Sequence, residues 1–216
     1  MGEVILQAVE LTKSYGKQAV LQRLSFALKE GEILGVAGEN GAGKSTLLSL
    51  LAMIQKPRSG KILFYGKDVF TIKRQYQDSL GYVPQEIALF EELSGLDNLR
   101  FFGKSYHIPK TELENRIREV CVILNFPEEE LKKPVSQYSG GMRRKINIGA
   151  ALLHQPKLLL LDEPVANLDE KTEEQVLITI KELAKQGTAI VYVGHRKKEM
   201  EQLCDRICVI EKGNRT

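Results

Sequence analysis

The chain has 216 residues and a mass of 24.3 kDa, enough for one domain with its own hydrophobic core but not for two large domains. Hydrophobic residues make up 43% and charged residues 27%, which excludes a disordered or fibrous chain. The formal net charge of +3 is too small to indicate a nucleic-acid or membrane-surface partner by charge alone.

Membrane insertion and disulfide bonding are also disfavoured. No apolar run approaches the roughly 18 residues that a spanning helix needs, so another polypeptide must cross the bilayer if the protein serves a membrane process. The first residues lack the basic start and long apolar segment of a signal peptide. Cys121, Cys204 and Cys208 form no CxxC pair, so we interpret them as packing residues of a protein in a reduced, cytoplasmic setting.

The first part of the chain is predicted to be mainly extended. Residues 4–16 and 19–31 read as strands with glycine-containing turns. Residues 32–38, EILGVAG, form an apolar strand that leads through a glycine-rich loop into a leucine-rich helix over 46–54. Residues 60–70 then resemble a hairpin that turns near Gly66.

The middle of the chain, from about Glu86 to Pro156, has a helical pattern. Thr111 and Glu114 have the spacing of a capping box at the start of one helix. One face of that helix is apolar, and we expect it to be buried; it consists of Leu113, Ile117, Val120, Cys121 and Leu124.

The alternation of strand and helix returns after Pro156. KLLLLD (157–162) and TAIVYVG (188–194) are continuous apolar strands, and residues 170–186 between them form an amphipathic helix that Gly187 ends. Continuous apolar strands that alternate with helices indicate a parallel sheet covered on both faces. The helical segment between the two α/β portions is therefore predicted to be a lobe and not an independent domain.

The glycine-rich loop carries the first functional motif. It reads Gly38-Glu39-Asn40-Gly41-Ala42-Gly43-Lys44-Ser45 and satisfies G-x-x-x-x-G-K-[ST] between a strand and a helix, which argues against a chance match. Glycines let the backbone wrap phosphates, and a helix N-terminus adds partial positive charge. We predict that this loop and Thr46 bind a nucleotide triphosphate, with Lys44 on the β- and γ-phosphates and the Ser45 hydroxyl on Mg²⁺.

The second half of such a metal site should be an acid at the end of an apolar strand. Asp162 and Glu163 directly follow the leucines at 158–161. Because ligands bind at the carboxyl ends of strands in open α/β sheets, we expect Asp162 to hold Mg²⁺, through a water molecule. Glu163 is predicted to polarise the attacking water as the general base, and its place beside a metal-binding acid argues against a merely solvated side chain.

One further motif completes a family pattern. Ser139-Gly140-Gly141 precedes these acids by about two dozen residues. In this order of motifs the whole chain resembles the nucleotide-binding domain of the ATP-binding cassette (ABC) transporter ATPases. The resemblance implies an α/β fold of the P-loop NTPase class with a mainly parallel sheet core, an N-terminal antiparallel β subdomain and an inserted helical subdomain. It implies a single ATPase domain over 1–216, with the α/β core in 1–85 and 157–216 and the helical subdomain at about 86–156.

The resemblance also implies roles for single residues. Tyr15 matches the adenine-stacking aromatic residue, with Val20 packing nearby. Gln85 matches the Q-loop glutamine, a ligand of Mg²⁺ or its water, and His195 matches the switch histidine that contacts the γ-phosphate. Asp169 closes the segment that matches the D-loop. Each of these residues alone would be a weak signal, and their order along the chain is what carries the assignment.

The Ser-Gly-Gly motif implies a site shared between two subunits. It opens a helix predicted to start near Met142, whose free N–H groups can bind a γ-phosphate. In the family that phosphate is held by the opposite subunit's phosphate loop, so that two cassettes enclose two ATP molecules. Tyr138 and Met142 stand where the family more often has leucine and glutamine, and the Ser-Gly-Gly itself is intact.

The function implied is that of a Mg²⁺-dependent ATPase subunit that powers transport through separate integral-membrane permease subunits. It would lie peripherally at the cytoplasmic face of the cell membrane and pair, in the ATP-bound state, with a second ATPase cassette that is identical or different. The segment LSGLDNLRFFGKSYHI (93–108) resembles exporters of drugs, peptides or similar substrates.

Two other classes of function fit the sequence less well. A soluble ATPase of the same superfamily that acts on nucleic acid or ribosomes would carry long coiled-coil insertions, zinc modules or two cassettes, and the sequence has none of these. We therefore expect no nucleic-acid partner. A non-hydrolysing, nucleotide-gated binding module would lack Glu163 or His195, and both are present.

The remaining polar residues receive structural interpretations. His107 and His154 are expected to be surface or helix-capping residues. The basic run 143–145, which follows the Ser-Gly-Gly motif, is expected to be a solvated helix face, with a phosphate contact as the alternative. The sequence ends at GNRT, where members of the family usually continue.

Overall fold

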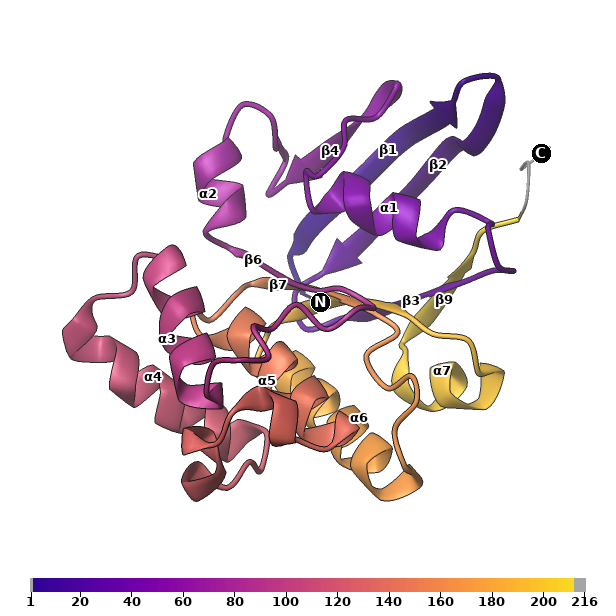
Figure 1. Cartoon of the computed structure of the whole chain (residues 1–216). Coiled ribbons are helices and arrows are strands. Elements are labelled where there is room, and N and C mark those ends of the chain that lie inside the picture. Colours follow the sequence, from indigo (N-terminus) through magenta and orange to yellow (C-terminus); the bar gives the residue numbers. More distant parts are fainter. Residues whose placement is uncertain (1, 212–216) are drawn as a thin grey trace.

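Two sheets organise the protein. The computed structural model describes residues 2–211, so the final segment GNRT lies outside the described residues. One sheet is antiparallel with the strand order β2-β1-β4-β5, and the other is parallel with the order β6-β7-β8-β3-β9 (Figure 1). The strands are β1 Val4–Tyr15, β2 Gln18–Lys29, β3 Ile33–Ala37, β4 Ser59–Phe64, β5 Lys67–Asp68, β6 Leu80–Val83, β7 Leu158–Asp162, β8 Ala189–Val193 and β9 Arg206–Val209.

The helices cover both faces of the parallel sheet. In Figure 1 α1 and the antiparallel sheet lie on one side of it, and α5, α6 and α7 lie on the other. The helices are α1 Lys44–Leu51, α2 Lys73–Gln77, α3 Gly95–Ser105, α4 Lys110–Ile123, α5 Gly140–Leu152, α6 Glu170–Lys185 and α7 Lys197–Leu203, with 3₁₀ turns at Glu128–Lys132 and Val135–Gln137. Among residues 2–211, no helix is long and apolar enough to cross a bilayer.

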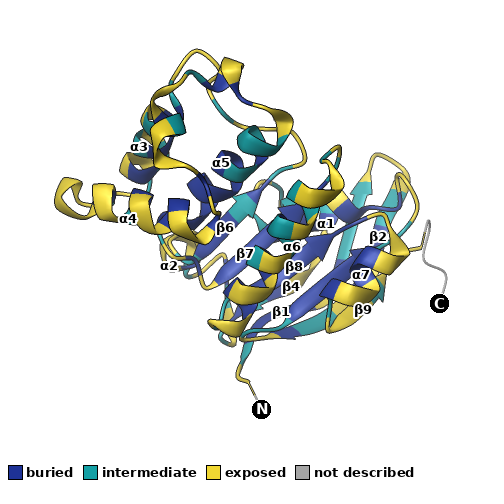
Figure 2. Ribbon diagram, turned by 90° about the horizontal axis from the view of Figure 1, so that it is seen from below, coloured by how far each residue is buried: buried dark blue, intermediate teal, exposed yellow. Residues whose placement is uncertain are grey.

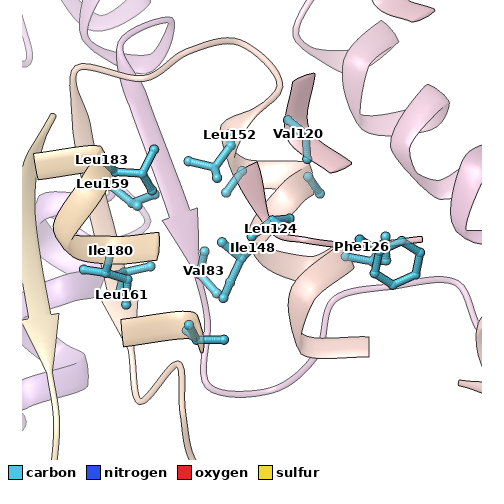
Figure 3. Packing of buried hydrophobic residues seen from close by; sticks show 14 of the residues in the cluster. Val83, Val120, Leu124, Phe126, Ile148, Leu152, Leu159, Leu161, Ile180 and Leu183 are labelled. Carbon is cyan, nitrogen blue, oxygen red and sulfur yellow. The ribbon is translucent and has the colours of Figure 1, made fainter. Parts of the chain in front are cut away.

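The central strands separate two hydrophobic cores. Successive side chains of a strand point to opposite faces of the sheet. In β7, Leu158 and Leu160 pack toward the antiparallel sheet and α1, whereas Leu159 and Leu161 pack toward the helices on the other face (Figure 3). Burying a leucine side chain contributes about 2 kcal/mol, so continuous apolar strands such as β7 hold both layers together. The predicted α/β fold, with its parallel core, antiparallel N-terminal sheet and helical insertion, is confirmed.

The helical segment packs through the face that the sequence predicts. Leu113, Ile117, Val120 and Cys121 of α4 are buried, and Leu124 directly after the helix is buried as well. Figure 2 shows the opposite face of α4 exposed to solvent. Cys121 is therefore a packing residue, as expected, and burial raises the pKa of its thiol to about 11.

The capping box predicted at Thr111 is wrong. α4 begins one residue earlier, at Lys110, and Pro109 is its N-cap, whose carbonyl accepts the N–H of Leu113 at 3.0 Å. Glu114 instead pairs with Arg100 at 2.8 Å. A capping interaction of the expected kind lies at the start of α3. There Ser94 Oγ accepts the N–H of Asp97 at 3.0 Å and donates to its Oδ2 at 2.6 Å.

The helix after the phosphate loop also differs from the predicted range of 46–54. It starts at Lys44 and ends at Leu51. It ends early because the chain turns back on itself at Met53, whose φ is +56°, and the N–H groups of Ile54 and Gln55 both donate to the Ser49 carbonyl.

Candidate active site

The phosphate loop turns from β3 into α1 through Gly43. Its φ of +113° strains any side chain, and a Cβ at this position would lie only 2.9 Å from Val20 Cγ1. α1 has no side-chain cap and no acid in its first turn among the described residues. The first N–H groups of α1 therefore remain available to an anion.

Lys44 is the one positive side chain inside this loop. It is only 6% exposed, and its Nζ donates to the carbonyl oxygens of Gly38 at 2.7 Å and Glu39 at 3.2 Å. Both acceptors are neutral and belong to the same loop. The ammonium group is thus oriented by its own segment, while its charge stays available for phosphate oxygens.

The Asp162 carboxylate and the Ser45 hydroxyl provide two oxygen ligands of the kind that Mg²⁺ binds. Asp162 ends β7 and is 3% exposed, and its Oδ1 is buried without a hydrogen-bond partner among residues 2–211. Burial raises the pKa of Asp162, and the neighbouring Ser45 side chain opposes that rise. Proteins usually bind Mg²⁺ through one or two carboxylates together with hydroxyl, water and phosphate oxygens. An unpaired carboxylate oxygen beside a hydroxyl matches that chemistry.

Glu163 is held between two neighbouring segments. Its Oε2 accepts a hydrogen bond from Gln85 Nε2 at 3.0 Å, and its Oε1 contacts His195 Nε2. Its backbone is left-handed, with a φ of +51°, and its N–H donates to the Val193 carbonyl at 3.0 Å. A non-glycine residue in this conformation carries strain of about 1–2 kcal/mol, which persists here because the surrounding contacts fix it. The carboxylate is therefore oriented before any substrate arrives.

Lys44, Ser45 and Glu163 lie around one open cavity of about 480 Å³, a volume typical of ligand sites. Its walls come from β2, the phosphate loop, α1 and the segments after β6, β7 and β8. The cavity is lined by Val20, Asn40, Gly41, Gly43, Lys44, Ser45, Thr46, Gln85, Glu163 and His195. Most of the predicted site residues thus lie together around a single space.

The other predicted residues do not line this cavity. Gly38, Glu39 and Ala42 lie in the same loop, and Asp162 is buried beside Ser45. Tyr15 is half exposed at the end of β1, where its hydroxyl donates to Gln55 Oε1 at 2.8 Å.

The Ser-Gly-Gly motif and Asp169 stand at the N-termini of helices instead. Ser139 caps α5 by accepting the N–H of Met142 at 3.2 Å, and a Cβ on Gly140 would meet no atom within 4 Å. Asp169 caps α6 by accepting the N–H of Thr172 at 3.0 Å. In a single chain these motifs are therefore separate from the cavity.

The interpretation of the basic run 143–145 as a solvated face is wrong for Arg144. This residue is 5% exposed and donates to the carbonyl oxygens of Pro84 at 3.2 Å and Gln85 at 2.9 Å. A sequence signal existed, because Arg144 stands four and seven residues before Ile148 and Ala151 on the buried face of α5. A charged side chain at that position outweighed the helical periodicity in the prediction.

His154 is likewise not a surface or capping residue. Its ring stacks on Tyr106 with centroids 3.9 Å apart, and Nε2 is 3.0 Å from the Leu80 carbonyl. Burial lowers its pKa, which favours the neutral ring. His154 thus packs between the end of α3 and β6.

Comparison with known proteins places these features in a family. The family model described as "ABC transporter" matches residues 21–166. The linearmycin resistance ATP-binding protein LnrL of Bacillus subtilis is 40% identical over 209 residues, covering 97% of this chain and 67% of that protein. The Nod factor export ATP-binding protein I of Sinorhizobium fredii is 36% identical, covering 99% of this chain and 62% of that protein. The chain thus spans about two thirds of the length of these relatives.

A solved structure agrees with this placement. A bacterial ABC transporter cassette, MJ0796, solved as a dimer, superposes with a TM-score of 0.84 at 26% identity. The match covers 97% of this chain and 95% of the other. The resemblance inferred from the motifs therefore extends to the fold.

Proposed function

The chain belongs to the ABC transporter family, and from this membership we propose that it is the ATP-binding and ATP-hydrolysing subunit of a transporter that works in export. One observation carries the proposal: the Glu163 carboxylate is fixed between Gln85 and His195 at the wall of the cavity that the phosphate loop forms. This arrangement combines a triphosphate cradle with an oriented proton acceptor.

In the proposed site, the phosphate loop binds the triphosphate. Backbone N–H groups of residues 38–46 and the start of α1 surround the phosphates, and Lys44 neutralises charge on the β- and γ-phosphates. Tyr15 and Val20 would contact the adenine base. Ser45, Asp162 and Gln85 would hold Mg²⁺ directly or through water, and the ion would supply positive charge to the phosphate oxygens.

Hydrolysis then requires one proton acceptor. Glu163 takes a proton from the water whose oxygen bonds to the γ-phosphorus, while the bond to the bridging oxygen breaks and ADP leaves. The hydrogen bond from Gln85 and the contact with His195 orient the two oxygens of the carboxylate, so little reorganisation is needed in the transition state. We propose that His195 also contacts the γ-phosphate, since it lines the same cavity as the phosphate loop.

The complete site is proposed to need a second cassette, identical or different. Ser139, Gly140, Gly141 and Asp169 stand at helix N-termini away from the cavity of their own chain, where they can face a nucleotide held by the partner. Closure around ATP does work because ATP binds the closed state better than the open one. We propose a single ATPase domain, with residues of about 86–156 acting as its helical subdomain.

The proposed partners also include integral-membrane permease subunits, which would place the chain peripherally at the cytoplasmic face of the membrane. Relatives named for linearmycin resistance and Nod factor export favour export over import. They give no support to the alternative of a soluble ATPase that acts on nucleic acid or ribosomes.

The decisive experiment is a co-purification. Tagged Glu163→Gln protein would be recovered with MgATP from detergent-solubilised membranes of the source cell. We expect a stoichiometric hydrophobic partner with several spanning helices. The matched control for the substitution is Glu174→Gln, on the exposed face of α6. Recovery only in the soluble fraction, with nucleic acid or ribosomal proteins attached, would contradict the transporter assignment.

A further inference from the structure

The segment that follows β6 depends on side chains from distant helices. Residues 84–90 form neither helix nor strand, so their backbone polar groups need other partners. Two of these partners are side chains of α5, the helix that the Ser-Gly-Gly motif opens, and a third is Asn98 of α3, which bonds both backbone groups of Phe90. This segment contains Gln85, whose amide donates to Glu163.

Arg144 is the first of these partners. Both of its hydrogen bonds among the described residues go to backbone carbonyls, those of Pro84 at 3.2 Å and Gln85 at 2.9 Å, and its Nε is buried without a partner. A planar guanidinium can bind two carbonyls on adjacent residues at once and fix their relative orientation. Burying a positively charged guanidinium that is paired only with neutral carbonyl groups is energetically unfavourable. Packing alone therefore does not explain an arginine at this position.

Asn147, one turn further along α5, is the second partner. It is 5% exposed, and its Oδ1 accepts the N–H of Ala88 at 3.1 Å. Residues 84–88 are thus held at both ends by one face of α5. A displacement of α5 must therefore move Gln85 as well.

The chain of contacts ends at the proposed general base. Gln85 Nε2 lies 3.0 Å from Glu163 Oε2, so the orientation of that carboxylate depends on where the backbone of residue 85 is fixed. Glu163 belongs to the segment after β7, and α5 belongs to the helical part of the chain. Arg144 therefore connects the helix that presents the Ser-Gly-Gly motif to the catalytic carboxylate.

We propose that Arg144 is a positioning residue for ATP hydrolysis: it fixes Gln85 to α5 and so orients Glu163 according to the position of the Ser-Gly-Gly helix. This inference rests on the proposed ATPase function. It predicts an effect on the chemical step and none on nucleotide affinity, because Arg144 does not line the nucleotide cavity.

The test is a double-mutant cycle in the transporter complex, with steady-state ATP hydrolysis as the readout. Arg144→Met should lower kcat about 10-fold and change KM less than about 2-fold. In a Gln85→Ala background, which keeps the backbone carbonyl but removes the amide, the same substitution should lower kcat by less than about 2-fold. Arg144→Lys, which can still donate to one carbonyl, should retain an intermediate kcat. Arg118→Met, on the exposed face of α4, is the matched control and should match the parent.

Two outcomes overturn the inference. One is an equal loss of kcat with and without the Gln85 amide, which would mean that Arg144 acts by another route. The other is an increase in KM at unchanged kcat. If Arg144→Met does not fold, Arg144→Lys and Asn147→Ala undergo the same cycle with the same criteria.

A second readout separates this inference from the proposed function. Hydrogen exchange of the amides in residues 85–90 should be faster in Arg144→Met than in the parent and in Arg118→Met, because the backbone of Pro84 and Gln85 loses its anchor. A parent complex that hydrolyses no ATP would refute the proposed function and leave this exchange result as the test. Unchanged exchange would refute the role of Arg144, whatever the ATPase activity.

Discussion

The phosphate loop and the segment 84–90 are both irregular, and each is held by a buried cation that donates to backbone carbonyls. In the phosphate loop the cation is Lys44, and its acceptors lie five and six residues away in the sequence. In the second segment the cation is Arg144, and its acceptors lie 59 and 60 residues away. Hydrogen bonds of the same kind thus join residues close in sequence in the phosphate loop and residues distant in sequence in segment 84–90.

This difference suits the two segments to different tasks, one to binding phosphate and the other to responding when α5 moves. A loop that carries its own cation keeps its shape whenever the strand and helix beside it are folded, so it can bind phosphate before any other part of the molecule moves. A loop fixed by a distant helix changes when that helix moves. The first arrangement suits a nucleotide cradle, and the second suits a segment that transmits the position of α5 to Glu163.

The largest effect is expected from removing the Lys44 side chain, whose hydrogen bonds lie within the phosphate loop. Lys44→Ala should raise the Kd for MgATP by at least about 100-fold, because it removes the charged donor from the phosphate site. Titration of the purified protein with a fluorescent ATP analogue measures this, and Lys61→Ala on the exposed face of β4 is the control for loss of a lysine. Unchanged affinity would contradict the phosphate-loop assignment.

The next substitution tests the proposed catalytic role of Glu163 separately from nucleotide binding by the phosphate loop. Glu163→Gln should bind MgATP and dimerise but turn over at least about 100-fold more slowly, because an amide cannot accept the proton from water. Single-turnover hydrolysis measures the rate, and Glu174→Gln should behave as the parent does. Hydrolysis at the parental rate would exclude Glu163 as the general base.

A substitution at the start of α5 tests the shared site. Ser139→Arg should leave ATP binding by the monomer within about 2-fold of the parent and block the ATP-dependent dimer, because a bulky cation replaces a small cap. Size-exclusion chromatography in the Glu163→Gln background measures the dimer. Ser139→Ala removes the cap without adding bulk and should still dimerise. Loss of monomer binding in Ser139→Arg would contradict the view that this motif acts on the partner's nucleotide.

The smallest effect is expected from substitutions at the starts of α3 and α4, and it concerns stability. Ser94→Ala should destabilise the protein by about 1 kcal/mol, because it removes the bond to the Asp97 N–H. Thr111→Ala should change the free energy of unfolding by no more than a few tenths of a kcal/mol, since Thr111 is not the residue that begins α4. Urea unfolding of both variants measures the two changes in the free energy of unfolding. Equal losses of stability would contradict a stabilising role of the Ser94 cap.

The fold was largely predictable because its signals are local and repeated. The apolar strands β7 (158–162) and β8 (189–193) are buried on both faces, and such runs admit few other arrangements. Helix boundaries were less predictable. The capping pattern at Thr111 predicted a start there, whereas Pro109 is the N-cap and α4 starts at Lys110.

The site divides in the same way. The phosphate loop and the acids at 162–163 could be found from sequence, since each motif and its flanking strand lie within a few residues. The contacts of Arg144, Asn147 and His154 could not, because their partners come from segments distant in the chain. Only a folded chain brings such partners within hydrogen-bonding distance.

The amino-acid sequence by itself therefore determined the family, the parallel core and the position of the phosphate loop between β3 and α1, because these follow from short patterns of glycine, charge and hydrophobicity. The tertiary structure alone decided that Glu163 lies between Gln85 and His195, and that a buried arginine on α5 holds the first of these. The physical reason is that polar groups in irregular segments take whichever partners packing supplies, and packing depends on the whole chain.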